Sequence, residues 1–211
     1  MVLRGDTLGS VSTSVPPPSR GGFRGSPLLH SFAWFEQRFG PAAAHAVIAK
    51  LPANWRALVK PNERAFGILG ARIYPYAFVG DMVRTMRDVV SVKDEDEFVR
   101  DATIAGLEAL LGTMHRLVVR WLVTPQTFLE HRQEIWNLYH DTGKLNVLSL
   151  TDREYVIQDA EWGNTDPVVC KVNLEGRRRM LSVMGLRYVD ARREKCRAWG
   201  HATCETRFRW A

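Results

Sequence analysis

Apolar residues in the N-terminal part of the chain recur every three or four positions, which places them on one face of a helix. Glycine, proline and capping residues divide this pattern into segments, because proline suits the first turn of a helix and glycine commonly follows the last. The pattern predicts helices at 31–40, 41–51, 75–89, 94–122 and 125–140, a helical turn near Trp55, and a kink at Gly112. The N-terminal half is therefore expected to be helical.

After Gly143 the pattern changes to alternating apolar and polar residues, which is typical of strands with one buried face. Two such runs, 145–150 and 154–159, flank a short polar turn and predict a β-hairpin. A helix is expected from Pro167 to Met184, followed by two more strands at 186–191 and 204–210. Two hairpins can pair into one small antiparallel sheet covered by helices, so the predicted fold class is α+β.

The first 28 residues differ from the rest of the chain. They are rich in Gly, Ser, Pro and Arg, and they bury too little apolar surface to offset the entropy cost of ordering. We expect residues 1–28 to be a disordered leader and residues 29–211 to form one domain. The most apolar stretch, 107–123, carries Glu108, Arg116 and Arg120, so no membrane span is expected. Because no secretory signal is visible either, the cytoplasm is the expected compartment.

The formal charge of +6 is uneven, because residues 171–211 hold eleven basic and four acidic groups. Such an excess indicates an anionic partner, such as a nucleic acid or a phosphorylated ligand, or a solvated face. No nucleic-acid-binding motif accompanies the charge, so nucleic acid is not an expected partner. The run Arg177-Arg178-Arg179 could clamp an anion or belong to a solvated helix face.

Motifs of known enzyme classes are absent. The chain has no glycine-rich phosphate loop, no G-x-S-x-G and no H-E-x-x-H. We therefore expect a protein that is not an enzyme.

The most informative motif lies near the C-terminus. Cys196, Gly200 and Cys204 form a C-x3-G-x3-C element followed by an alternating strand, and Cys170 and Gly176 stand in the preceding helix. This arrangement resembles the C-terminal signature of 4-vinyl reductase (V4R) domains, and of bacterial proteins related to haem–nitric-oxide-binding domains. The resemblance covers about residues 31–210. It implies a fold shared with ligand-binding domains of nitric-oxide signalling and with vesicle-tethering subunits, and a role in sensing small hydrophobic molecules.

The resemblance also implies zinc, since cysteines at these three places hold a structural zinc in some aromatic-responsive regulators. Zinc takes four ligands in a tetrahedron, and thiolates are preferred donors. In those regulators an acid lies three residues before the second cysteine; here Arg193 takes that place and Glu194 follows it. His201 is an alternative fourth ligand. The candidate metal ligands are thus Cys170, Cys196, Cys204, Glu194 and His201. The alternative is three partly buried thiols that serve packing.

Haem is not an expected cofactor. Haem–nitric-oxide-binding domains use a Tyr-x-Ser-x-Arg element, and the similar segment 188–192 has Asp190 in its middle position. His115, His131 and His140 lie on predicted helices, and no spacing singles out one of them as an iron ligand.

Aromatic residues in the middle of the domain could line an apolar ligand pocket, although such side chains also fill ordinary cores. The candidates are Trp121, Trp136, Tyr139 and Tyr155. The leading hypothesis is a sensor-type domain that binds a small hydrophobic molecule and acts on a separate protein partner. The alternatives are an interaction or scaffold subunit without a ligand, and a haem-based gas sensor. A homodimer is compatible with each.

Overall fold

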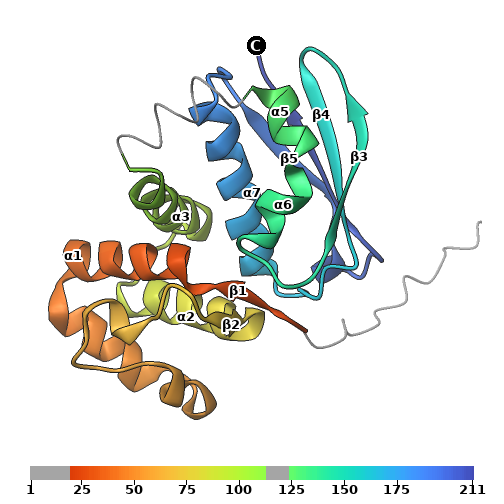
Figure 1. The fold of residues 1–211 in the computed structure, drawn as a ribbon. Helices are drawn as coiled ribbons and strands as arrows, with labels where there is room; N and C mark the ends of the chain where they lie inside the picture. The colour runs from red at the N-terminus through yellow and green to blue at the C-terminus, as the bar shows by residue number, and fades with distance from the viewer. Residues whose placement is uncertain (1–19, 113–123) are drawn as a thin grey trace, which may run out of the picture.

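The computed structural model describes residues 20–112 and 124–211. A helical half lies beside a sheet half (Figure 1). The helical half contains α1 (Gly25–Lys50), α2 (Tyr76–Val89), α3 (Glu95–Leu111) and two short 3-10 helices, η1 (Ala53–Leu58) and η2 (Arg64–Gly67). Within the described ranges, no helix combines the length and hydropathy needed to cross a membrane.

The sheet half contains four antiparallel strands in the order β3-β4-β6-β5. The strands are β3 (Lys144–Leu150), β4 (Glu154–Ala160), β5 (Asp190–Lys195) and β6 (Cys204–Arg209). One face of this sheet is covered by α5 (Pro125–Glu130), α6 (Arg132–Asn137) and α7 (Pro167–Val183), as Figure 1 shows. The α+β class and the pairing of two hairpins are confirmed.

Local sequence signals set several helix ends. The Asp94 side chain accepts a hydrogen bond from the backbone N–H of Glu97 at 2.9 Å and so caps α3. Thr124 caps α5 in the same way, through the N–H of Thr127 at 3.1 Å. Helix α1 breaks where two helices were predicted to meet, because Gly40 has a φ of 85°, a conformation that is costly for residues with a Cβ.

The predicted leader is too long. Residues 22–24 form β1, which pairs with β2 (Ile73–Pro75), and α1 begins directly after β1. Phe23 and Leu28 are buried and supply the apolar contacts that hold this segment in place. The composition of residues 1–28 is polar on average, so these two buried apolar residues were not recognised from the sequence. Residues 1–19 lie outside the described residues.

Two other predicted elements differ from the structure. The strand expected at 186–191 lies at 190–195, and its inward position 193 is an arginine, which a search for apolar alternation passes over. The helix expected at 125–140 is divided into α5 and α6 at His131. The continuation of α3 beyond Gly112 falls outside the described residues.

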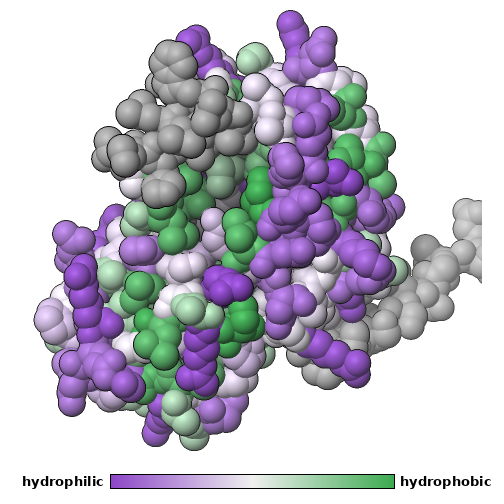
Figure 2. Space-filling model, viewed as in Figure 1, coloured by the Kyte–Doolittle hydropathy of each residue, from purple (hydrophilic) through white to green (hydrophobic). Residues whose placement is uncertain are grey.

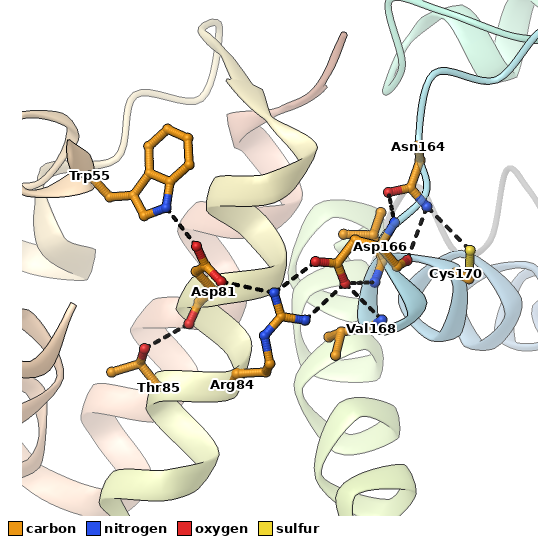
Figure 3. A network of polar contacts seen from close by, with 9 residues as sticks. Trp55, Asp81, Arg84, Thr85, Asn164, Asp166, Val168 and Cys170 are labelled. Carbon is orange, nitrogen blue, oxygen red and sulfur yellow. Dashed lines mark hydrogen bonds and ion pairs between the residues drawn. The ribbon is translucent and has the colours of Figure 1, made fainter. Parts of the chain in front are cut away.

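A polar network joins the two halves (Figure 3). Asp166 caps α7 by accepting hydrogen bonds from its first backbone N–H groups, and the same carboxylate binds both terminal nitrogens of Arg84 on α2, at 3.0 and 2.7 Å. Arg84 also binds Asp81 at 2.9 Å. Residue 80 is a glycine, and a Cβ at Gly80 would overlap the Asp166 carboxylate. The close approach of α2 to the start of α7 therefore depends on residues from both halves.

Candidate ligand site

A cavity of about 130 Å³ lies where the helical half meets the sheet half. Helices α1, α2 and α3 form one side of its wall, and α5, α6, α7 and the start of β3 form the other. Most of the wall is aliphatic or aromatic. Figure 2 shows apolar side chains reaching the surface in the band between the two halves. A cavity of this composition suits a ligand with an apolar body.

Of the histidines in the described residues, only His140 lines this cavity. Its ring stacks on Trp136 with centroids 3.8 Å apart, and its Nδ1 lies 3.0 Å from Oη of Tyr76. Burial, and to a lesser extent the positive charge of Arg177, lowers the pKa of His140 well below its usual range. Burial also raises the pKa of Tyr76. At neutral pH both rings are therefore uncharged.

Two arginines and one carboxylate are buried next to the cavity. Asp159 on β4 has no exposed surface and binds Nη2 of Arg177 at 2.6 Å and Nη1 of Arg193 at 3.1 Å. Arg193 also donates to the backbone carbonyl of Cys170 at 2.9 Å. The guanidinium of Arg177 lies 5.1 Å from the ring centroid of Trp136, a cation–π distance. The single negative charge of Asp159 therefore pairs with the positive charges of two buried arginines.

The three cysteines converge beside Arg193. Sγ of Cys196 lies 3.3 Å from Sγ of Cys170 and 3.8 Å from Sγ of Cys204, and all three sulfurs lie within 4.8 Å of one another. Zinc–sulfur bonds of about 2.3 Å in a tetrahedron separate the sulfurs by roughly 3.8 Å, so the arrangement fits three of the four corners. The neighbouring thiols, Cys170 first, lower the pKa of Cys196, and the same contact raises that of Cys170.

Neither predicted fourth ligand joins the cysteines. Glu194 binds Arg207 at 2.6 Å, and His201 is exposed. Successive strand residues point to opposite faces, so the inward side chain of Arg193 places Glu194 on the outer face. In the described part of the chain, the group of side chains able to share a metal ion at this place contains the three cysteines alone.

Solved structures with this fold include H-NOX, or haem–nitric-oxide-binding, proteins. The Fe(II) unliganded H-NOX protein from K. algicida matches with a TM-score of 0.65 and 10% identity, over 89% of this chain and 96% of that one. An H-NOX protein from S. oneidensis in the Fe(II)NO state matches with a TM-score of 0.61 and 12% identity, over 88% and 99%. An oxygen-binding H-NOX domain related to soluble guanylate cyclases matches with a TM-score of 0.57 and 8% identity, over 88% of this chain and 94% of that one. The chain has an H-NOX-like fold.

No protein-family model matches the chain, and no curated protein matches it either. The resemblance to V4R domains therefore stays a prediction, whereas the relation to haem–nitric-oxide-binding domains is supported at the level of the fold. The two neighbours from K. algicida and S. oneidensis are described in Fe(II) and Fe(II)NO states.

The H-NOX-like fold brings together some of the predicted pocket residues. Trp136 and Tyr139 line the cavity. Tyr155 is buried on the sheet, where it stacks on Phe208 with centroids 5.8 Å apart, and it is not part of the described wall. Trp121 lies outside the described residues. Tyr188, the first residue of the segment that resembled a haem motif, is 86% exposed and does not line the cavity.

Sequence reasoning missed the buried charges of this fold. Asp159 follows Tyr155 and Ile157 in the alternating run of β4, so the period of two already places its carboxylate on the buried face. An acidic residue at such a position indicates a buried cation, since unpaired charges are rarely buried. No comparable signal identifies Arg177 as its partner.

Proposed function

We propose that this chain is a sensor-type domain that binds a small ligand in the cavity between its two halves. The observation that carries this proposal is the position of the cavity, since its wall is built from helices of both halves. A ligand there contacts α2, α3 and α7 together, so its binding affects how the halves are held against each other. A separate protein partner would then respond to that change.

A haem-based gas sensor is the second candidate, supported by the fold of the H-NOX proteins. Haem needs an iron ligand and room for a porphyrin. In the described wall the available histidine is His140, which is stacked on Trp136 and bonded to Tyr76. A volume of about 130 Å³ also lies below the roughly 300–1,000 Å³ of pockets for larger ligands. These described residues do not fit haem, and His115 lies outside the described residues.

The cysteines support a separate proposal, a structural zinc that ties α7 to the hairpin of β5 and β6. Cys170 comes from α7, and Cys196 and Cys204 flank the turn of that hairpin. The three sulfurs have the spacing of three corners of a zinc tetrahedron, and a structural zinc takes a fourth ligand to complete it.

The proposed ligand site is tested with the full chain and two probes, toluene and haem. We expect toluene to bind saturably at one site by calorimetry, and Ala102→Phe, which fills the cavity from α3, to abolish this binding. Haem added to the protein is expected to give no stable absorption band of a ligated iron. A stable haem complex would establish the second candidate instead. If neither probe binds, the ligand-free scaffold hypothesis is favoured.

A further inference from the structure

The charges around the cavity are unbalanced. Arg132 and Arg177 line it, and its described wall contains no Asp or Glu. Arg177 shares its carboxylate, Asp159, with Arg193, while Arg132 donates to two backbone carbonyls that carry no charge. Among the described residues Asp159 is thus the one carboxylate bound to Arg177, and Arg132 has no ion pair. Arg177 is nearly buried and Arg132 is partly exposed, so the cost falls mainly on Arg177, and an anion in the cavity would reduce it.

Arg177 also has an unused hydrogen-bond donor. Its Nη2 donates to Asp159 at 2.6 Å, but Nη1 is buried and has no partner among the residues that the structure describes. Buried donors are nearly always paired, because an unpaired one loses the hydrogen bonds that it makes in water. The guanidinium lies over Trp136, which itself lines the cavity. The unused donor therefore stands beside the aromatic part of the wall.

The size and composition of the cavity limit the ligand further. Apolar cavities of about 150 Å³ hold a molecule the size of benzene. A volume of about 130 Å³ with a mainly apolar wall thus admits one small ring or a short branched chain. The positive charge and the unpaired donor of Arg177 favour a ligand with a carboxylate at one end.

We propose that the cavity binds a compact monocarboxylate with an apolar body, of about the size of benzoate, and that a small rotation of the Arg177 guanidinium brings Nη1 to its carboxylate. This inference specifies the ligand class of the proposed function and rests on it. Arg177 is then the residue that selects an acid over a neutral molecule of the same shape.

The test compares benzoate with toluene by calorimetry on the full-length protein. Because charge-assisted hydrogen bonds are the stronger kind, we expect benzoate to bind roughly tenfold or more tightly than toluene. Arg177→Gln removes the charge and should abolish this preference. Arg178→Gln is the matched control, since the neighbouring Arg178 binds Glu175 and is not part of the wall. The control should keep the preference of the unmodified protein.

The outcomes separate the two proposals. Toluene binding that equals or exceeds benzoate binding overturns the inference and leaves the ligand site intact. Benzoate binding that survives Ala102→Phe or is unchanged in Arg177→Gln places the acid elsewhere and also overturns it. Binding of neither probe overturns the proposed function itself. If Arg177→Gln fails to fold, the ratio of the dissociation constants for benzoate and toluene in the unmodified protein still decides the inference.

Discussion

At the scale of single residues, His140 links the cavity to the stability of the fold. Its ring has an aromatic neighbour on one face and a tyrosine hydroxyl at Nδ1, and burial followed by the charge of Arg177 depresses its pKa. In the unfolded chain the same ring takes up a proton near pH 6.5. The folded state therefore binds fewer protons, and acid favours unfolding.

The expected result is a loss of about 1.4 kcal/mol in the free energy of unfolding from this group between pH 7.5 and pH 5.5. The stability contribution is present above pH 6.5 and is lost as the pH falls below it. Urea unfolding at a series of pH values measures it, with His140→Gln as the comparison. The variant is expected to show a flatter profile over this interval, whatever its absolute stability. Parallel profiles would show that folding does not lower the pKa of His140.

Single substitutions also decide between the candidate zinc ligands. We expect zinc analysis of chelator-free protein to give about one ion per chain, and Cys196→Ser to lose it, because removing one of three thiolates leaves too few donors. Glu194→Gln and His201→Ala are the controls and should retain zinc, since Glu194 binds Arg207 and His201 is exposed. Metal-free wild-type protein would refute the zinc proposal. Loss of zinc in either control would instead identify a fourth ligand that reaches the sulfurs.

At the scale of secondary-structure elements, the start of α7 has two functions. Asp166 caps the helix and also holds Arg84 of α2, so one carboxylate stabilises an element and its attachment to the other half. Asp94 on α3 is a useful contrast, because its recorded side-chain hydrogen bond is the cap alone. Comparing the two residues separates the stability contributed by a helix cap from the stability contributed by the contact between the two halves.

We expect Asp166→Ala to lower the free energy of unfolding by about 3 kcal/mol and Asp94→Ala by about 1 kcal/mol. The larger loss arises because Asp166→Ala also leaves a partly buried arginine without its main partner. Urea unfolding followed by circular dichroism measures both values, and unchanged m-values would show that the folded states stay compact. Equal losses in the two variants would mean that the Arg84 contact contributes little.

The elements that sequence predicted are those whose signals are local. The α3 and α5 caps, the break at Gly40 and the hairpin of β3 and β4 each follow from residues a few positions apart. The first pair of short strands, β1 and β2, was missed because its partners are about fifty residues apart, and each has only three residues. The position of β5 was missed because its inward arginine is stabilised by Asp159, a contact that exists only after folding.

The candidate site was predictable to the same limited extent. The resemblance to V4R domains implied that the three cysteines lie together, and their sulfurs converge. The cavity has no sequence pattern, because its wall combines residues from both halves and from most of the helices. The buried charge of Arg177 likewise follows from the fold, since neighbours in the same arginine run bind the surface carboxylates of Glu175 and Glu108.

At the scale of the whole molecule, the N-terminal segment connects the two halves. The backbone N–H of Arg20 donates to the carbonyl of Gly163 at 2.7 Å, and that of Arg24 donates to Tyr139 at 2.8 Å. Phe23 lines the cavity and stands edge-on to His140, with centroids 4.9 Å apart. On its other side, β1 pairs with β2 of the helical half. The segment thus contacts both halves at the edge of the proposed ligand site.

Two truncations follow from this position. Removing residues 1–19 leaves every described residue in place, and this chain serves as the reference. Removing residues 1–24 deletes the strand and the buried Phe23, and loss of a large buried side chain alone costs about 3–5 kcal/mol. We expect that truncation to unfold at much lower urea concentration and, where it still folds, to bind toluene more weakly, because one side of the cavity is open. Equal stability of the two truncated chains would show that β1 adds nothing to the attachment of the halves, and the domain would then begin at α1.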